Sequence, residues 1–325
     1  MQQFKTKQSG VALITVLLIL AVMVIVATNM TSRLQIGLMR TEGQVLSQKA
    51  YWYGQAAEAF VGMTLKSTLN DDDVVSLSQA WATSGMSFPL DGGNISGKIT
   101  DMQSCFNLNA LDVEDKTDGN KALVAQQFQA LLETLGVEGY YAEQITDSVR
   151  DWVDKNDQVV SSQGAEDSFY EARGVPHLAA NAAMAHVSEF RAIQAVSAGV
   201  YDRVSPYLCV VPDKDWILNV NTVSPEQPAI FQAMFTPRLS AEQAQGLLDE
   251  RPQNGWSTKE DFFAASSLAG IDFPDEIKKQ VDVKSQYFEL QGVAEFDATQ
   301  VALQALFRAT KQEVVTLRRQ YGGVQ

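Results

Sequence analysis

The sequence predicts an α+β fold in which a long N-terminal helix packs on a small antiparallel sheet and a large, mostly α-helical domain is inserted between strands. Three observations support this prediction. An uncharged apolar run begins at Val11 and passes without a proline into a pattern typical of an amphipathic helix, which ends near Met63. Three segments close to the C-terminus have the composition of strands joined by tight connections. The region between them is rich in helical patterns.

The composition is that of a folded, acidic protein. The chain has 325 residues, 46% of them hydrophobic and 20% charged, and a formal net charge of −14 at pH 7. Proteins that bind nucleic acid use Lys and Arg to displace counterions from phosphates, so we expect no nucleic-acid partner. The two histidines are too few for a His-rich catalytic metal centre, and the sequence contains no nucleotide-binding or serine-hydrolase motif. We therefore expect a protein that is not an enzyme.

The N-terminus combines a short basic segment, MQQFKTKQSG, with the apolar run that starts at Val11. A secretory signal peptide carries its small-residue cleavage site after the apolar run, whereas here the small residues that end the basic segment precede it. The apolar residues 11–27 would reach roughly 25 Å as a helix, which is close to the thickness of bilayer hydrocarbon. We expect a leader over residues 1–10 and a transmembrane and amphipathic helix over residues 11–63.

This arrangement resembles the type IV prepilin class, in which a prepilin peptidase removes the leader and methylates the new N-terminus. The resemblance implies cleavage between Gly10 and Val11 and N-methylation of Val11. An uncleaved signal anchor is the alternative. Lys5 and Lys7 precede the apolar run and favour a cytoplasmic location for the N-terminus.

Thr15 marks a departure from the prepilin pattern. Pilins and most pseudopilins carry Glu at the fifth position after the cut, where its carboxylate is assumed to pair with the N-terminus of the adjoining subunit. A subunit with Thr15 in that position has no carboxylate to neutralise the positively charged N-terminus of a subunit ahead of it. We therefore expect a position at the end of a filament, with the alternative that threonine simply fits a helix in lipid.

The sheet is expected to combine residues 64–109 and 285–325, on the two sides of the insertion. Residues 70–97 are rich in Asp, Ser and Gly and predict loops and turns, and residues 97–107 alternate enough for a strand. The strands near the C-terminus are expected to form an antiparallel meander. They cover residues 286–296, 299–309 and 313–321.

The insertion, residues 110–284, contains a weak internal duplication. An Asn-x-Asn turn occurs in FNLNAL (106–111) and again in LNVNTV (218–223), and each is followed by a helix that begins Phe-Gln-Ala and by a second helix. Asn suits such turns because its side chain accepts hydrogen bonds from backbone N–H groups. Neither copy carries the Gly-rich, basic hairpin that grips DNA phosphate, so we interpret both helix-turn-helix-like units as protein scaffold.

One dense group of carboxylates lies in the insertion, with Lys155 as its single basic residue. Calcium takes six to eight hard oxygen ligands in a flexible geometry, which a carboxylate-rich loop can supply. The loop lacks the Gly and Glu positions of an EF-hand. The residues leave a calcium site and a solvated acidic loop as open interpretations. The candidate ligands are Asp151, Asp154, Asp157, Glu166, Asp167 and Glu171.

The two cysteines, Cys105 and Cys209, are candidates for one disulfide if the compartment is oxidising. A bridge between them would tie the first strand to the insertion and close a loop of about 100 residues. Two buried free thiols are the alternative.

Five further segments make the family resemblance specific. Together with the leader and Thr15, they resemble, in order and nearly from end to end, the K-class minor pseudopilins of the type II secretion system (general secretion pathway protein K). The segments are SCFNLNAL (104–111), RDWVDKND (150–157), GAEDSFY (164–170), VSEFRAI (187–193) and LNVNT (218–222).

The resemblance implies a pilin-like body that carries the helical insertion and caps the tip of the periplasmic pseudopilus with the I-class and J-class minor pseudopilins. It further implies contacts with other pseudopilins, support for the export of folded proteins across the outer membrane, and the secreted protein as a further candidate partner. It also implies a single pass through the bacterial inner membrane, with the N-terminus cytoplasmic and the main domain periplasmic. Finally, it favours calcium over a solvated loop at the carboxylate group.

A membrane-anchored periplasmic binding or chaperone-like protein with a calcium-stabilised head is the alternative function. The leader distinguishes the two, because only a pilin requires cleavage between Gly10 and Val11.

Overall fold

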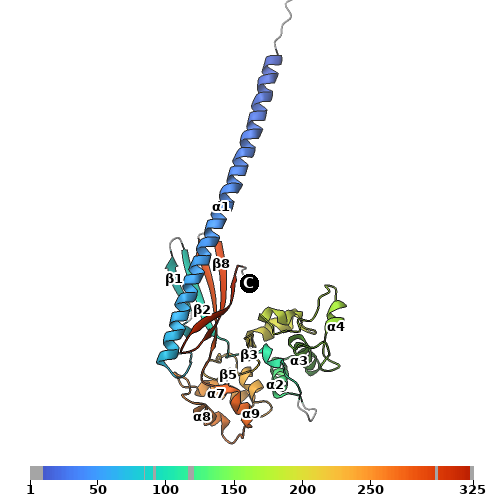
Figure 1. Cartoon of the computed structure of the whole chain (residues 1–325), viewed down its shortest axis with the longest axis vertical. Helices are drawn as coiled ribbons and strands as arrows, with labels where there is room; N and C mark the ends of the chain where they lie inside the picture. The colour runs from blue at the N-terminus through green and yellow to red at the C-terminus, as the bar shows by residue number, and fades with distance from the viewer. Residues whose placement is uncertain (1–9, 84, 91–92, 116–120, 297–298, 323–325) are drawn as a thin grey trace, which may run out of the picture.

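The protein has the predicted α+β fold, with a rod-like helix, a sheet and a separate helical domain (Figure 1). The predicted leader, apart from Gly10, lies outside the part of the chain that the structure describes. The computed structural model describes residues 10–83, 85–90, 93–115, 121–296 and 299–322.

Helix α1 spans Val11–Asp71 and so continues eight residues beyond the predicted end at Met63. Its first half, which starts with the apolar run from Val11, projects away from the rest of the molecule and is exposed (Figure 1). In the described part of the chain it is the one helix long and apolar enough, by length and composition, to cross a membrane. The additional turns persist despite their polar sequence because Leu65 and Leu69 are buried in the core, and packing outweighs helix propensity.

A five-stranded antiparallel sheet packs on the second half of α1, in the order β1-β2-β7-β8-β9. The predicted C-terminal meander is confirmed, because consecutive strands β7, β8 and β9 pair with one another. The strands are β1 (Met86–Leu90), β2 (Gly93–Asp101), β7 (Tyr287–Phe296), β8 (Thr299–Ala309) and β9 (Val314–Tyr321).

The first part of the sheet differs from the prediction. Residues 70–97 are not only loops, because they contain β1 and the start of β2. β1 is an edge strand, which tolerates Pro89 because no further strand requires its N–H. Strand β2 ends at Asp101 instead of continuing to residue 107, because the Asp101 carboxylate accepts the Gln103 N–H at 2.8 Å and turns the chain.

Helix α1 is fixed to the last strand by a charged and aromatic contact. Glu58 is buried and accepts hydrogen bonds from Arg319 Nε at 2.7 Å and from the Tyr321 hydroxyl at 2.8 Å. Gly54 lies one turn earlier, where an added Cβ would come within 2.5 Å of Tyr321 Cε1. The absence of a side chain at Gly54 therefore allows this contact to form.

We expect Gly54→Ala to destabilise the protein by about 1–2 kcal/mol, although alanine favours helix by about 1 kcal/mol over glycine. The new methyl group displaces the Tyr321 ring and weakens its bond to Glu58. Gly62→Ala is the matched control in the same helix, where an added Cβ would lie 3.9 Å from Val314, so we expect a gain of about 0.5–1 kcal/mol. Urea unfolding of both variants measures this, and stabilisation by both would contradict the role of Gly54.

In the part of the inserted domain that the structure describes, helices α2 to α9 accompany four short strands in two parallel pairs. Its α-helices are α2 (Leu123–Thr134), α3 (Gly139–Val153), α4 (Asp167–Glu171), α5 (Ala198–Val204), α6 (Ala229–Met234), α7 (Ala241–Glu250), α8 (Lys259–Phe263) and α9 (Asp275–Lys279). Its strands are β3 (Phe106–Asn107), β4 (Leu208–Cys209), β5 (Leu218–Asn219) and β6 (Val281–Asp282). Short 3₁₀ helices cover Ala80–Ala82, before the sheet, and Leu108–Leu111, Val187–Ala192, Ser205–Tyr207 and Ser266–Leu268.

The two Asn-x-Asn turns make equivalent hydrogen bonds. Asn109 bonds both the N–H and the C=O of Met184, at 2.7 and 3.1 Å, and Asn221 bonds both groups of Trp256, at 2.7 and 3.0 Å. Each turn directly follows a strand that pairs in parallel with a later one, β3 with β4 and β5 with β6. The insertion is therefore built from two structural repeats, each closed by a strand pair.

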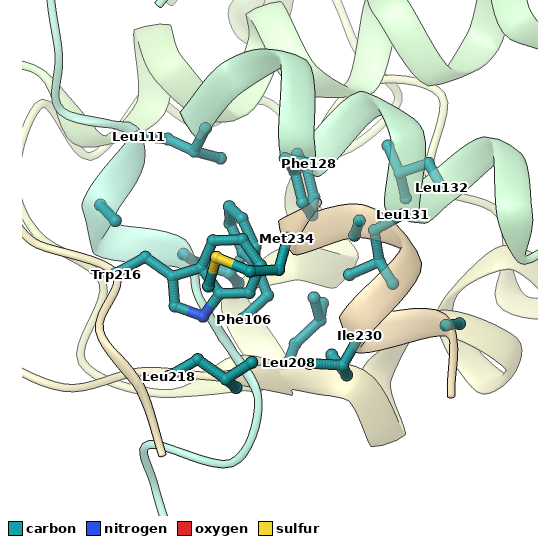
Figure 2. Close-up of a cluster of buried hydrophobic side chains, with 14 of the residues drawn as sticks. Phe106, Leu111, Phe128, Leu131, Leu132, Leu208, Trp216, Leu218, Ile230 and Met234 are labelled. Carbon is teal, nitrogen blue, oxygen red and sulfur yellow. The ribbon is translucent and has the colours of Figure 1, made fainter. Parts of the chain in front are cut away.

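The two repeats share one hydrophobic core (Figure 2). Phe106 of the first repeat packs between Phe128 on α2 and Trp216, with ring centroids 4.8 and 4.5 Å apart. Met234 on α6 of the second repeat joins this cluster, and its C=O accepts a hydrogen bond from Gln127 on α2 at 2.8 Å. The shared core makes the insertion one packed unit.

Candidate functional site

The six candidate ligand residues, which together we call the carboxylate group, lie at the end of α3, in the loop that follows it and in α4. Asp151 occupies the last turn of α3 and its Oδ1 accepts the N–H of Val160 at 2.8 Å. Glu166 is the residue before the first turn of α4. The loop closes over Asp151 at Gly164, where any Cβ would overlap the carboxylate. Glycine is therefore required at position 164, where the backbone of the loop comes closest to the Asp151 carboxylate.

Several oxygens in the group are buried without a hydrogen-bond donor among the described residues. They are Asp151 Oδ2, both carboxylate oxygens of Glu166, and Asn181 Oδ1. The Ala165 N–H lowers the pKa of Asp151, but it does not form a hydrogen bond with Asp151 Oδ2. Buried oxygens that accept no hydrogen bond are costly unless a cation or water binds them. As metal ligands, these oxygens suit a hard cation.

Burial is the main cause of perturbed acidity in this group. It raises the pKa of Asp151 to about 7. Burial also raises the pKa of Glu166 to about 7, with smaller contributions from the negative charges of Asp151 and Asp154. The pKa of Asp154 is likewise raised, mainly by burial. These groups resist ionisation in the absence of a positive partner.

The other candidate ligands have different surroundings. Asp157 Oδ1 accepts from Asn181 Nδ2 at 2.8 Å, and Asp167 Oδ1 accepts the Ala179 N–H at 2.9 Å, so both hold the loop that follows α4. Glu171, at the end of α4, is exposed. Across the described residues, no three Asp, Glu, His or Cys side chains converge as a metal centre. A cation here would therefore also need amide or backbone oxygens.

Two residues of this region were not among the candidates. Asn181 donates its amide N–H to Asp157, and its buried amide oxygen has no donor among the described residues. Its φ is positive at 45°, a conformation that Asn tolerates better than most residues. Asp147 is fully buried one turn before Asp151, where Lys121 at 3.1 Å and the Ser161 hydroxyl at 2.6 Å serve it. Its helical spacing from Asp151 was a usable signal, whereas Asn181 lies too far along the chain to have given one.

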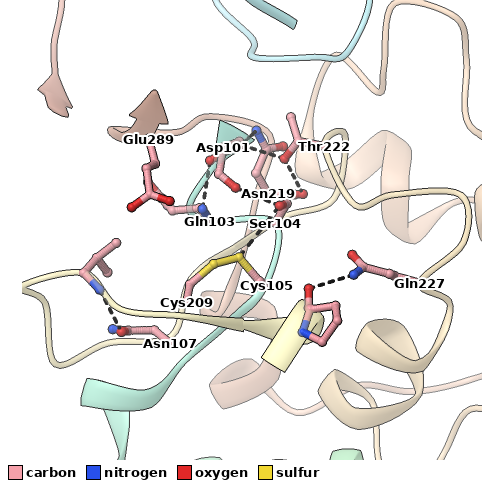
Figure 3. The surroundings of a disulfide bond; sticks show 12 residues. Asp101, Gln103, Ser104, Cys105, Asn107, Cys209, Asn219, Thr222, Gln227 and Glu289 are labelled. Carbon is pink, nitrogen blue, oxygen red and sulfur yellow. Dashed lines mark hydrogen bonds between the residues drawn. A yellow bond between two sulfur atoms is a disulfide. The ribbon is translucent and has the colours of Figure 1, made fainter. Parts of the chain in front are cut away.

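Cys105 and Cys209 form a disulfide at the junction of the sheet and the insertion (Figure 3). Their Cα atoms are 5.6 Å apart because β3 and β4 pair in parallel beside them. Both cysteines are buried, and the Cys105 C=O accepts a hydrogen bond from the Trp216 ring at 2.9 Å. The bond ties the end of the first sheet segment to the end of the first repeat.

Asp101 is a buried polar centre at the same junction, and the sequence did not reveal it (Figure 3). Its Oδ2 accepts from the Thr222 hydroxyl at 2.6 Å, the Ser285 hydroxyl at 2.5 Å and Asn219 Nδ2 at 3.2 Å. Burial raises the pKa of Asp101, and these hydrogen bonds oppose that shift. The second repeat is thereby joined to strand β2.

At the N-terminus, Gly10 directly precedes the first residue of α1. The Thr15 hydroxyl donates to the Ala12 C=O at 2.9 Å, so it is satisfied inside the helix and carries no unpaired polar group into lipid. The cleavage, the methylation and the assembly role of Thr15 remain predictions.

A long, exposed apolar helix on a small antiparallel sheet, with a helical domain inserted between strands, defines a membrane-anchored, pilin-like subunit. Family models described as type II secretion system (T2SS), protein K, match residues 104–213 and 218–284, which correspond to the two repeats of the insertion. The chain belongs to the type II secretion system protein K family.

Relatives of that family match over nearly the whole chain. The type II secretion system protein K of Aeromonas hydrophila is 42% identical over 98% of both chains, and that of Pectobacterium carotovorum 34% identical over 98% of both. A solved structure, the GspK-GspI-GspJ complex from the enterotoxigenic Escherichia coli type 2 secretion system, matches with a TM-score of 0.81 at 34% identity. The match covers 88% of this chain and 100% of that one. The minor pseudopilin role is therefore supported, and an anchored binding or chaperone-like protein is not favoured.

Proposed function

We propose that this minor pseudopilin caps the tip of the periplasmic pseudopilus together with I-class and J-class minor pseudopilins. The related K chain is part of a complex with GspI and GspJ, and the similarity covers all of that chain. The shape supports a cap, because the insertion lies at the end of the molecule away from the projecting half of α1, where it would obstruct a further subunit (Figure 1). The protein acts as a structural component of secretion and not as an enzyme.

The proposal includes the route to the membrane. A prepilin peptidase cuts between Gly10 and Val11, and α1 then anchors the subunit in the inner membrane with its N-terminus cytoplasmic and its head periplasmic. The uncharged, exposed segment at the start of α1, residues 11–32, supports a single-pass anchor. The basic residues that precede it favour this orientation.

Intact mass of the membrane-fraction protein tests this proposal. We expect a peptidase-dependent chain that begins at methylated Val11 and co-purifies with the I-class and J-class subunits. Gly10→Leu should block cleavage, whereas Gly37→Leu, at a helix position with nothing within 4 Å, is the control and should be cleaved normally. A chain that still begins at Met1 in the presence of the peptidase would overturn the pilin assignment.

Calcium at the carboxylate group is also part of the proposal. Asp151 Oδ2, the Glu166 carboxylate and Asn181 Oδ1 would hold the ion, because these buried oxygens accept no hydrogen bond among the described residues. Asp154, which lies close enough for its charge to act on Glu166, would complete the negative environment. The ion would join the end of α3 to the start of α4 and stabilise the loop between them.

Removing calcium should lower the melting temperature of the protein. A site with a Kd of about 10 µM contributes about 2.7 kcal/mol at 1 mM calcium, or roughly 5–10 °C for a domain of this size. Scanning calorimetry with and without EGTA measures the effect. Glu166→Gln should abolish the response, whereas the exposed Glu171→Gln is the matched control and should retain it. An unchanged melting temperature of the wild type in EGTA would refute the site.

The metal-free protein should lose stability as the pH rises from about 4 to 7. The pKa values of Asp151 and Glu166 are raised to about 7 in the folded state, so the folded state holds more protons than the unfolded state across this window. We expect a loss on the order of 2 kcal/mol, discounted for solvent screening near Glu166. Urea unfolding at pH 4.5 and 7.5 checks it, on protein freed of calcium with EGTA at neutral pH and transferred to calcium-free buffers. Saturating calcium should reverse the slope, and a metal-free protein that is more stable at pH 7.5 would contradict the assignment.

A further inference from the structure

The two repeats of the insertion share one order of contacts, so they can be compared residue by residue. In each repeat the second Asn of the turn holds the backbone of one later residue, which is Met184 in the first repeat and Trp256 in the second. Two positions further on, His186 and Thr258 each cap a helix with a capping box. An acidic residue three positions later accepts the N–H of the cap, at 3.0 and 3.1 Å. The repeats therefore match in register from the held residue onward.

The repeats differ just before the held residue. In the second repeat five residues, 251–255, connect the end of α7 to Trp256. In the first repeat 30 residues, 154–183, connect the end of α3 to Met184. We call residues 154–183 the strap, which contains α4 and all of the carboxylate group except Asp151. Because the second repeat closes with five residues at this place, the strap is an addition to the repeat and not a requirement of its fold.

The strap buries few side chains. Three of its 30 residues are buried, whereas ten of the fifteen residues of α3 are buried. The Val160 N–H and the Ser161 hydroxyl donate hydrogen bonds to carboxylates of α3, at 2.8 and 2.6 Å. A segment held mainly by polar contacts, with little apolar burial, opens at a lower free energy than the core beside it. The three buried residues are Ala165, Glu166 and Tyr170.

Most of the buried polar atoms that lack a hydrogen-bond partner in the described part of the chain lie between the strap and α3. There are nine such side-chain atoms, and seven belong to the strap or to Asp151 and Trp152, which it covers. None of the nine lies in residues 218–284, the second repeat, which the structure describes in full. Four of the seven are carboxylate or amide oxygens that a cation can bind, on Asp151, Glu166 and Asn181. Closing the strap without an ion is therefore costly.

We propose that the strap is a separate structural unit, which a calcium ion closes over α3 and which opens without the ion while the rest of the insertion stays folded. This inference rests on the calcium site of the proposed function. The ion would join the two sides of the contact, because Asp151 lies on α3 whereas Glu166 and Asn181 lie in the strap. The first repeat keeps its own closure, since the bonds between Asn109 and Met184 lie outside the strap. Calcium would thereby decide whether the head presents the closed strap or the uncovered face of α3.

Hydrogen exchange of the full chain in detergent at pH 7.5, followed by mass spectrometry, tests the proposal. For a Kd of about 10 µM, 1 mM calcium should slow exchange in strap peptides about 100-fold, because the ion binds only the closed strap. In EGTA, strap peptides should exchange at least about 100-fold faster than peptides of α2 and α7, which stay folded. Equal protection of the strap and these helices in EGTA would overturn the proposal. A melting temperature that EGTA leaves unchanged would instead refute the calcium site itself.

A replacement variant tests whether the first repeat closes without the strap. Residues 154–183 are exchanged for the five residues Arg-Pro-Gln-Asn-Gly that connect α7 to Trp256. We expect peptides of α2 and α7 to keep their protection and the melting temperature to be the same in calcium and in EGTA. Glu166→Gln is the matched variant that retains the strap, and its strap should exchange in 1 mM calcium as fast as that of the wild type in EGTA. Loss of protection in α2 and α7 of the replacement variant would place the strap in the core and contradict the proposal.

Discussion

Replacing Asp101 with alanine is expected to lower the free energy of unfolding by about 4 kcal/mol. The substitution removes an acceptor shared by Asn219, Thr222 and Ser285 in a buried site. Asn219 keeps the Val75 C=O and Thr222 keeps the Asn219 C=O as acceptors, so the Ser285 hydroxyl loses most. An unsatisfied buried donor costs about 1–3 kcal/mol, and the two hydroxyls can recover part of this loss by reorienting. Equilibrium unfolding in urea at neutral pH measures the change.

Two further variants make this result interpretable. Asp101→Asn retains one acceptor oxygen and should cost about half as much, which remains measurable if the alanine variant fails to fold. Asp202→Ala, at an exposed position on α5, should change stability by less than about 0.5 kcal/mol. If Asp101→Ala changed the free energy of unfolding as little as Asp202→Ala, the buried hydrogen bonds of Asp101 would not stabilise the contact between the sheet and the insertion.

Loss of the disulfide should have an effect of similar size, about 4 kcal/mol. The bond joins cysteines 104 positions apart, and closing a loop of that length restricts the unfolded chain. The chain-entropy model gives roughly 4–5 kcal/mol for such a loop. The double variant Cys105→Ala and Cys209→Ala should therefore unfold at a markedly lower urea concentration than the oxidised wild type.

The reduced wild type separates the cross-link from packing. Both sulfur atoms are buried, so the alanine variant loses contacts as well as the bond, whereas reduction removes the bond alone. We expect the reduced wild type to be about 3–4 kcal/mol less stable than the oxidised form. The oxidised protein should also take up no alkylating reagent in denaturant, and labelling of both thiols there would disprove the bond.

Sequence patterns predicted the elements whose stability is local. The apolar run from Val11, the alternating C-terminal strands and the repeated Asn-x-Asn turns each repeat a signal over neighbouring residues, and the structure contains all three. The end of α1 was misplaced because Leu65 and Leu69 are held helical by the sheet, which the local sequence does not encode. Strand β1 was missed for the same reason, since its partner β2 stabilises it.

The sequence by itself determined the long apolar helix, the C-terminal meander and the position of the acidic group, because each depends on composition or on spacing within one segment. The family followed from the resemblance of several motifs along the chain. Only the tertiary structure decided which polar side chains meet. Asp101 gains its partners from residues 219, 222 and 285, and Asn181 reaches Asp157 from a separate loop. Hydrogen bonds and cation ligands depend on distances of about 3 Å between segments far apart in the chain. The tertiary fold sets those distances, and no pattern within one segment of the sequence predicts them.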